Sequence, residues 1–230
     1  MRGGKKNLLI TVGLIVGAAA AGLLFFYKTQ TSWVESPLYQ RVSKSPARSL
    51  VVVYSRTGNT LSAAKEGARF FDADLLQIAA PQYARTIKGQ LLASQHADQE
   101  VTTTPIQHDP VDLSSYDLIF LCSPTWWFRP APPLWSFVET HDFAGKPVFL
   151  LMTGNSRLKE ELIGKFGTLV EEKNGKFLGS LFIRRGRIYW QKTPDEVNEE
   201  VRDALDARQR MWPKTANPDL TTRAFPNLGK

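Results

Sequence analysis

The sequence predicts an α/β domain, a doubly wound five-stranded parallel sheet, preceded by one transmembrane helix. Residues 49–212 alternate short apolar runs with stretches of helical periodicity, which implies parallel strands covered by helices on both faces. Residues 8–26 form a run of 19 residues without a charge. As a helix, this run would span about 28 Å and could cross a bilayer. The 230 residues therefore hold one folded domain and one anchor.

The apolar segment, residues 8–27, is expected to be retained in the chain. A cleavable signal peptide is the alternative, but its apolar stretch is usually about 7–15 residues long and the cleavage site lies just beyond it. Here the small residues 18–21 are followed by further large apolar residues at 23–26. This order favours a single-pass anchor.

Two polar segments flank the anchor. Residues 1–7 form a short basic N-terminus, and residues 28–48, with Ser, Thr, Pro and mixed charge, are expected to be a tether between membrane and domain. Because basic residues occur on both flanks, the positive-inside rule does not decide which side of the membrane holds the domain. Residues 213–230 are expected to be a C-terminal tail.

The excess positive charge belongs to the N-terminal segments. Residues 1–48 hold seven of the 29 basic residues and one of the 22 acidic residues, which leaves 22 basic and 21 acidic residues at positions 49–230. A nearly neutral domain has no charge excess to neutralise phosphates, so nucleic acid is not an expected partner. One cysteine, Cys122, and three scattered histidines give no pattern for a disulfide framework or a metal site.

The first half of the domain opens with a strand at residues 50–54, whose continuous apolar run is typical of burial on both faces. A helix at 59–71 and a second strand at 74–78 follow. The helix places apolar residues on one side, namely Leu61, Ala64, Ala68 and Phe71. The segment 80–112 then breaks the rhythm. A helix is expected at 83–95 and no regular element at 101–110, and we assign this segment no chemistry.

The second half repeats the alternation. Strands are expected at 116–122, 147–152 and 177–183, and helices at 132–140, 157–173 and 193–211. The first of these helices begins with Pro132 and Pro133, and the last with a capping box of Thr193 and Glu196. The middle helix has Leu158, Leu162, Phe166 and Leu169 in register. Residues 187–190 could pair with the last strand.

Ligands of such sheets bind beyond the carboxyl ends of the strands. The loop after the first strand has hydroxyls and a glycine, which with the amides of the following helix can hold a terminal phosphate. Its residues are Ser55, Arg56, Thr57, Gly58, Asn59 and Thr60. The Gly-Lys-Ser/Thr of nucleotide triphosphatases is absent. An ordinary helix cap and turn is the alternative interpretation.

Two further loops extend this edge. The loop after the third strand carries three consecutive aromatic residues, Trp126, Trp127 and Phe128. An exposed aromatic cluster needs a cover, and a flat conjugated ring stacking on an indole would provide one. The loop after the fourth strand, residues 153–156, offers hydroxyl, amide and backbone groups to the edge of such a ring.

These motifs resemble the flavodoxin-like family over residues 49–212. The segment Ser55-Arg56-Thr57-Gly58-Asn59-Thr60 matches the family's phosphate-loop pattern, and Pro124-Thr125-Trp126-Trp127 is similar to the branch with a double tryptophan. The resemblance implies the strand order 2-1-3-4-5 and noncovalent binding of FMN. It implies that the residues of the first loop hold the phosphate. It also implies that Pro124, Thr125, Trp126, Trp127 and Phe128 flank the isoalloxazine, and that Thr153, Gly154 and Asn155 contact its far edge.

Some positions depart from the family pattern. Phe128 stands where related sequences usually have glycine, and residues 153–156 lack the fuller Gly-Gly-Ser-Gly run. The domain also lacks the strong acidity by which soluble flavodoxins meet basic partners. We expect Arg129 to lie near the flavin as a cation that raises its potential, with a position over an aromatic face or in solvent as the alternative. No catalytic acid or base is assigned.

Three functions remain open from the sequence. The first is a membrane-anchored FMN electron carrier, in the inner membrane of a bacterium, whose redox partner is an unknown protein or a quinone. The second is an FMN oxidoreductase that takes hydride from NAD(P)H and reduces quinones or nitro compounds. The third is an interaction module that kept the fold but lost the flavin.

Overall fold

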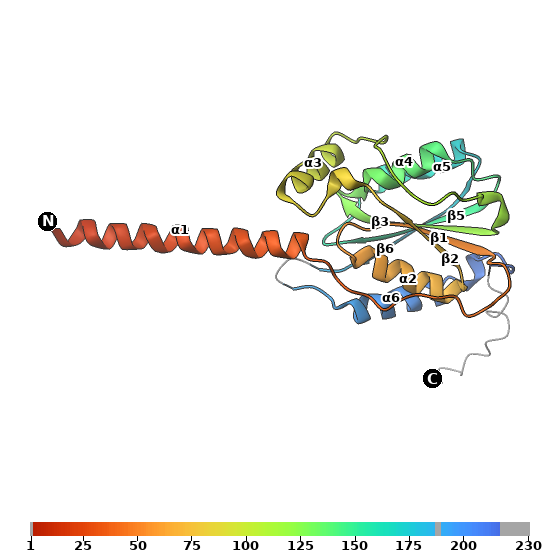
Figure 1. The fold of residues 1–230 in the computed structure, drawn as a ribbon, viewed down its shortest axis with the longest axis horizontal. Coiled ribbons are helices and arrows are strands. Elements are labelled where there is room, and N and C mark those ends of the chain that lie inside the picture. The colour runs from red at the N-terminus through yellow and green to blue at the C-terminus, as the bar shows by residue number, and fades with distance from the viewer. Residues whose placement is uncertain (1, 187–189, 217–230) are drawn as a thin grey trace.

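The computed structural model describes residues 2–186 and 190–216, and Figure 1 shows an α/β domain from which one long helix projects. The proposed pairing of 187–190 lies mostly outside these residues, as does most of the tail 213–230. The strands are β1 (Ser49–Tyr54), β2 (Asp74–Ile78), β3 (Leu118–Trp126), β4 (Arg129–Pro130), β5 (Pro147–Gly154) and β6 (Lys176–Arg184). The helices are α1 (Arg2–Thr31), α2 (Asn59–Phe71), α3 (Ile87–Asp98), α4 (Pro132–Thr140), α5 (Glu160–Glu172) and α6 (Pro194–Asp206).

The sheet confirms the expected fold. Its order is β2-β1-β3-β5-β6, and all four pairings along this path are parallel. This is the order 2-1-3-4-5 of the five strands predicted from the sequence. The sixth strand, β4, pairs antiparallel with the end of β3. The carboxyl ends of β1, β3 and β5 therefore meet at one edge, where the three candidate loops follow.

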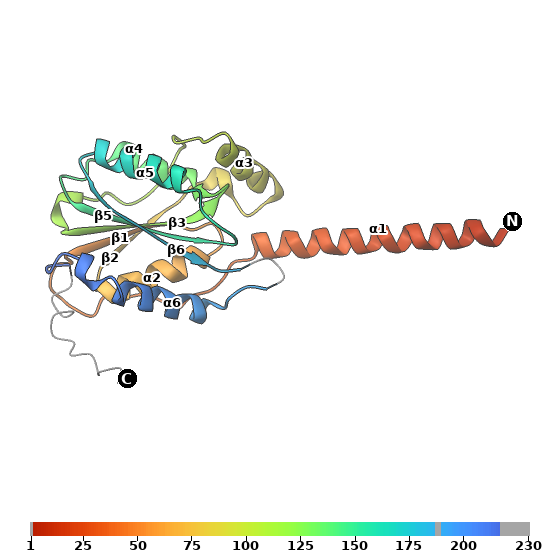
Figure 2. The same ribbon diagram turned by 180° about the vertical axis from the view of Figure 1, so that it is seen from behind.

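Helices cover both faces of the sheet, as Figures 1 and 2 show from opposite sides. The α2 and α6 side buries a core that includes Val51, Phe71 and Phe120. The α4 and α5 side buries a second core that includes Leu121 and Phe166. Because successive residues of a strand point to opposite faces, a central strand must be apolar at every position, which explains the continuous runs in the sequence.

Several expected boundaries shift, and local bonding explains most of the shifts. Helix α3 begins at Ile87 because Thr86 caps it, accepting a hydrogen bond from the Gly89 N–H at 3.1 Å. The expected helix at 193–211 ends at Asp206 and continues as a short 3-10 turn. Strand β3 runs on to Trp126, four residues past the expected end, because it forms a hairpin with β4.

Residues 32–48, here named the connecting segment, were expected to be part of a tether but lie along α2 (Figure 1). Lys65 on α2 donates hydrogen bonds to the carbonyls of Ser36 and Pro37 at 3.2 and 2.9 Å. The Tyr39 hydroxyl donates to the carbonyls of Ala68 and Ala73, at 3.1 and 2.6 Å. Burial, reinforced by the nearby Asp72 carboxylate, raises the pKa of Tyr39 to about 12.

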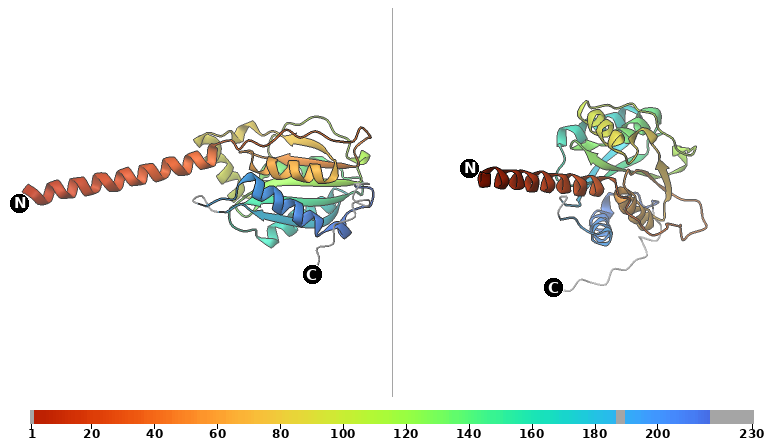
Figure 3. Two further views of the ribbon diagram at one scale, coloured as in Figure 1. Left: turned by 90° about the horizontal axis from the view of Figure 1, so that it is seen from below. Right: turned by 60° about the vertical axis from the view of Figure 1, so that its left-hand side comes forward.

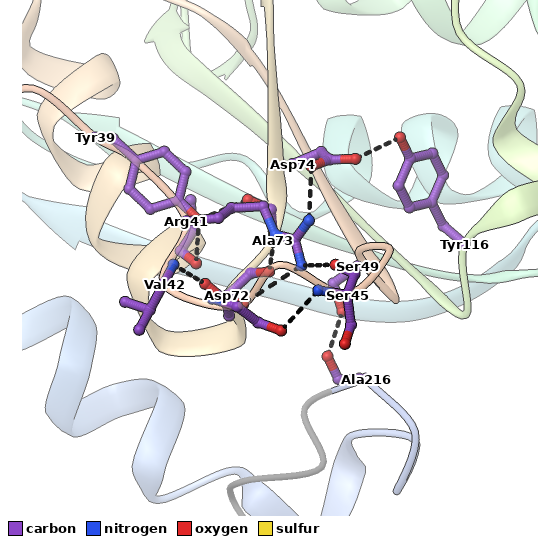
Figure 4. A network of polar contacts seen from close by, with 12 residues as sticks. Tyr39, Arg41, Val42, Ser45, Ser49, Asp72, Ala73, Asp74, Tyr116 and Ala216 are labelled. Atoms are coloured by element: carbon purple, nitrogen blue, oxygen red, sulfur yellow. Dashed lines mark hydrogen bonds and ion pairs between the residues drawn. The ribbon is translucent and has the colours of Figure 1, made fainter.

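A polar network fastens the far end of the same segment (Figure 4). Arg41 donates to the Asp72 carbonyl at 2.8 Å and forms ion pairs with the carboxylates of Asp72 and Asp74. The Asp72 carboxylate also accepts the backbone N–H groups of Val42 and Ser43. Asp72 ends α2 with a φ of 46°, which turns its side chain toward the connecting segment. The segment is therefore bonded to the domain along most of its length.

Helix α1 projects away from the domain in both views of Figure 3. Its stretch Ile10–Thr29 is long and apolar enough to cross a bilayer, with a mean hydropathy of 2.1. Signal sequences near an N-terminus share this length and composition.

Candidate functional site

A cavity of about 430 Å³ lies at the carboxyl edge of the sheet. It gathers residues from all three candidate loops. Those that line it are Arg56, Thr57, Asn59, Thr60, Pro124, Thr125, Trp126, Trp127, Phe128, Thr153, Gly154 and Asn155. Ser55 and Gly58, which the sequence also suggested, do not line it: Ser55 faces a neighbouring hollow, and Gly58 lies against the connecting segment.

The first loop is shaped by a close backbone approach. Gly58 has a φ of 85°, and a side chain there would meet the Val34 carbonyl. The Val34 N–H in turn donates to the Thr57 carbonyl at 2.9 Å. The Asn59 amide donates to the Thr57 hydroxyl at 3.0 Å, which holds both side chains beside the start of α2. Hydroxyl, amide and helix N-terminal groups thus converge on one end of the cavity.

Arg56 is held by the segment between β2 and α3. Its guanidinium donates to the carbonyls of Tyr83 and Ala84 at 3.0 and 3.1 Å and to the side chain of Gln90. Burial lowers the pKa of Arg56. The side chain therefore contributes positive charge to the cavity wall, and its hydrogen bonds also connect the first loop to α3 and the residues before it.

The second loop is a hairpin rather than an irregular segment. Trp126 pairs with Arg129, and Trp127 and Phe128 form the turn between them. Both turn residues have positive φ, 48° and 68°. Two-residue hairpin turns of type I′ need positive φ at both central positions, which usually selects Asn-Gly. Phe128 thus occupies a backbone position suited to glycine, and its carbonyl accepts the Lys159 N–H at 3.1 Å.

The two indoles have different surroundings. Trp126 packs edge-on against Tyr54 and Tyr83, with ring centroids 5.6 and 5.3 Å apart. Trp127 is 52% exposed, and its indole N–H donates to the Ser94 hydroxyl at 3.0 Å. Trp126 therefore belongs to the packed wall of the cavity, whereas Trp127 offers an aromatic surface to an occupant.

The third loop is joined to the first. The hydroxyls of Thr60 and Thr153 lie 2.8 Å apart and are buried. Thr125 places a buried hydroxyl in the cavity wall, and this hydroxyl has no hydrogen-bond partner among the described residues. A buried hydroxyl without a partner is costly, so this atom is suited to a polar group of a ligand.

Four lining residues were missed by the sequence analysis. Gln90, Ala93 and Ser94 come from α3, so the segment 80–112, to which we assigned no chemistry, supplies one wall. Arg185, the fourth, follows β6, and Ser156 lines the cavity as the last residue of the predicted third loop. The position of Arg185, just past the last strand, was a usable signal. The α3 residues gave none, because their role depends on where the insertion packs.

Arg129 does not face the cavity, so the expectation that it lies near a bound ring is wrong. It is 1% exposed, and its guanidinium lies 4.4 Å from the centroid of the Trp135 ring. This matches the alternative of a position over an aromatic face. Residues alternate across a strand, so β4 directs this side chain into the core. Arg185 lines the cavity together with Arg56 instead, and the backbone N–H of Arg185 donates to the Gly154 carbonyl at 2.8 Å.

The charge of the cavity is one-sided. Among the residues that the structure describes, Arg56 and Arg185 line it and no Asp or Glu does. Burial lowers the pKa of Arg185 as well as that of Arg56. With hydroxyls at one end and an exposed indole beside them, these groups suit an anionic ligand with a flat ring. Fold and site together define a doubly wound α/β protein with a ligand cavity at the carboxyl edge.

The chain belongs to the flavodoxin family, because the family model described as flavodoxin matches residues 48–192. None of the curated proteins matches the chain.

Solved structures share the fold at low sequence identity. A flavoprotein in complex with FMN from Lactobacillus acidophilus is 20% identical, with a TM-score of 0.51; the match covers 60% of this chain and 93% of that one. A putative flavoprotein from Bacteroides uniformis is 21% identical, with a TM-score of 0.55; that match covers 70% and 99%. One from Bacteroides eggerthii is 20% identical, with a TM-score of 0.53, and the match covers 70% and 98%. At such identities the likeness establishes the fold.

Proposed function

We propose that this protein binds FMN at the carboxyl edge of its sheet and transfers electrons through it while α1 anchors it in a membrane. The observation that carries the proposal is that the first loop, the exposed indole of Trp127 and the loop at Thr153 all line the same cavity. Membership of the flavodoxin family and the FMN complex of the similar Lactobacillus acidophilus protein support the same ligand.

The residues present fit this cofactor. The hydroxyls of Thr57 and Thr60, with the amides at the start of α2, would hold the phosphate. Trp127 would cover one face of the ring system, and the partnerless hydroxyl of Thr125 would meet a polar ring atom. When bound, FMN supplies one- and two-electron redox chemistry. Arg185 would place a positive charge beside the ring, which favours added negative charge and raises the potential.

The membrane part of the proposal rests on α1. The apolar stretch Ile10–Thr29 has the length and hydropathy of a spanning helix, and it continues past the small residues where a signal peptide would be cleaved. A location in the inner membrane of a bacterium, with the domain on one side, is consistent with one such helix. The redox partner would be a protein or a quinone at that membrane.

The test is the visible spectrum of the purified full chain in detergent after incubation with FMN and removal of free flavin. We expect a flavin band at about one equivalent, as one site per chain implies. Trp127→Ala should lose most of it. Trp190→Ala, which removes a similarly exposed indole outside the cavity, should retain it. No retained flavin would contradict the proposal and favour an interaction module.

A second assay separates carrier from enzyme. The flavin-loaded chain is mixed with NADH or NADPH and a soluble quinone, and nucleotide oxidation is followed. An electron carrier should show no steady oxidation without a partner protein. Sustained oxidation would instead assign the chain to the NAD(P)H-dependent oxidoreductases.

A further inference from the structure

The loops around the cavity carry several basic residues. Segments 55–58, 79–86, 123–131, 155–159, 185–186 and 190–193 follow the carboxyl ends of strands, and these described segments contain no Asp or Glu. We name these segments and the first turn of α3 the pocket edge. Its exposed bases are Arg85, Lys88, Arg157 and Lys159, with Arg184 at the end of β6 beside them. The first turns of α5 and α6, which follow these segments, add Glu160, Glu161, Asp195 and Glu196, so bases outnumber acids at this end without excluding them.

The opposite edge carries both signs of charge. Asp72, Asp117 and Asp142 lie there beside Arg41, Arg48, Lys146 and Lys176, and Arg41 and Arg48 form ion pairs with Asp72 and Asp117. The acids of that edge are therefore largely matched by bases. The excess of bases around the cavity attracts anions over about one Debye length, roughly 8–10 Å at ordinary ionic strength.

Large apolar side chains are exposed on the same edge. Ile87 and Leu91 lie one turn apart on α3 and are 63% and 65% exposed. Trp127 at the hairpin turn and Trp190 after β6 are also exposed. Indoles and bases interleaved on one surface are the composition of protein segments that lie in the headgroup zone of a membrane.

Helix α1 leaves the domain from this edge, as Figures 1 and 2 show. Arg85 donates to the Thr31 carbonyl at the end of α1 at 3.3 Å, and its guanidinium lies 5.4 Å from the Trp33 ring centroid. Val34 is bonded to Thr57 in the first loop. The connecting segment then runs back along α2, where the hydrogen bonds of Lys65, Tyr39 and Arg41 hold it to the domain. The exit point of α1 is therefore fixed beside the cavity.

We propose that the pocket edge rests on an anionic lipid surface, so that the mouth of the cavity faces the headgroups of the membrane that α1 crosses. The inference rests on the membrane anchoring proposed above. The charge of the edge complements anionic headgroups, its indoles and α3 side chains suit the interface, and the exit of α1 brings this edge to the bilayer. A redox partner would then approach the cavity along the membrane.

The experiment measures how close each edge lies to lipid. Cys122 is fully buried, so a cysteine introduced at the surface is labelled selectively with a thiol-reactive fluorophore. Leu91→Cys reports on the pocket edge, and Lys176→Cys, exposed at the amino end of β6, reports on the opposite edge. The full chain is placed in vesicles of phosphatidylcholine, alone or mixed with phosphatidylglycerol, that contain a lipid with a nitroxide headgroup. Flotation first establishes that the protein is in the vesicles.

We expect the label at position 91 to be quenched several-fold more than the label at 176, and more strongly with phosphatidylglycerol. Replacing Lys88, Arg157 and Arg184 together by Gln should reduce quenching at position 91 to the level at 176. The matched control replaces Lys44, Lys146 and Lys176 by Gln, which removes the same charge from elsewhere and should leave quenching at 91 unchanged.

The outcomes are distinguishable. A chain that does not float with the vesicles would contradict the anchoring itself. If the chain floats but both labels are equally unquenched, the pocket edge does not face lipid. The alternative is then that a partner protein covers this edge. Quenching at 91 that is the same in both lipid mixtures and in both triple variants would overturn the role of charge, since proximity to the anchor would suffice.

Discussion

Gly58 lies so close to Val34 that a Cβ on the glycine would be 2.2 Å from the Val34 carbonyl oxygen. This contact joins the loop proposed to hold a phosphate to the first residues after α1. The φ of 85° at Gly58 adds a second reason for glycine, since other residues rarely adopt it. The connecting segment and the cavity are therefore one structural unit, and a change at one should be felt at the other.

Gly58→Ala should destabilise the domain by about 1–3 kcal/mol, because the new methyl group displaces Val34 and the backbone is strained. FMN retention should fall as well. Urea unfolding and the flavin spectrum measure the two effects. Gly164→Ala is the control: this glycine lies in α5 with open space around it, so the change should stabilise by up to about 1 kcal/mol. Equal effects at both positions would contradict the close-contact explanation.

The two tryptophans should separate stability from binding. Trp126→Ala removes a ring packed on Tyr54 and Tyr83, so we expect a loss of about 2–4 kcal/mol in unfolding free energy. Trp127→Ala should change stability by less than about 1 kcal/mol, because the side chain is mostly exposed. It should weaken FMN binding by about tenfold through lost stacking. Titration of FMN against intrinsic fluorescence measures affinity, and a Trp127→Ala protein with wild-type affinity would refute the stacking role.

Phe128→Gly should relieve backbone strain at the hairpin turn. A residue at a φ of 68° costs about 1 kcal/mol relative to glycine, and the loss of the ring's contacts with Arg157 and Lys159 offsets part of the gain. We expect a net stabilisation below about 1 kcal/mol with FMN still retained. Glu100→Gly, at a φ of 53° on the surface, is the control for strain relief without an effect on the flavin. A destabilised Phe128→Gly protein would mean that the ring contributes more than the strain costs.

Arg185→Gln should lower FMN affinity by about tenfold and lower the potential of the bound flavin, because it removes the positive charge at the end of β6. Arg184→Gln removes an equal charge from the adjacent exposed residue outside the cavity and should leave both quantities nearly unchanged. Equilibrium dialysis and redox titration make the comparison. Equal effects of the two substitutions would indicate a general charge effect rather than a contact.

Acid should weaken the domain partly through His141. Burial lowers its pKa below the ordinary 6.5, while its ring stacks on Phe137 and donates to the Phe137 carbonyl at 2.7 Å. The unfolded chain therefore binds a proton at a higher pH than the folded chain, so stability falls as pH drops through about 6.5 and on to the lowered value. His141→Gln should remove up to about 1 kcal/mol of the loss between pH 7.5 and 5.5, measured by urea midpoints. An unchanged pH dependence in the His141→Gln protein would contradict this role of His141.

Local signals determined most of the fold. The helices at 59–71 and 132–140 and the strand at 74–78 have the bounds expected from their patterns, because apolar periodicity and proline placement act within a few residues. The strand order followed from the resemblance of the candidate loops, taken together, to the flavodoxin-like family. Twelve of the residues that line the cavity were predicted from these loops. The prediction was possible because parallel strands bring their carboxyl ends together at one edge of the sheet.

Tertiary structure decided the rest, because each remaining feature depends on residues distant in the chain. Arg129 is buried on Trp135 while Arg185 faces the cavity, a choice made by the hairpin pairing of β4. The cavity wall formed by α3 depends on where the segment 80–112 packs, which its sequence pattern does not indicate. Composition gave a nearly neutral domain, whereas only the fold placed Arg56 and Arg185 at the cavity. Charge counts add along a chain, but the field they create depends on where folding carries each residue.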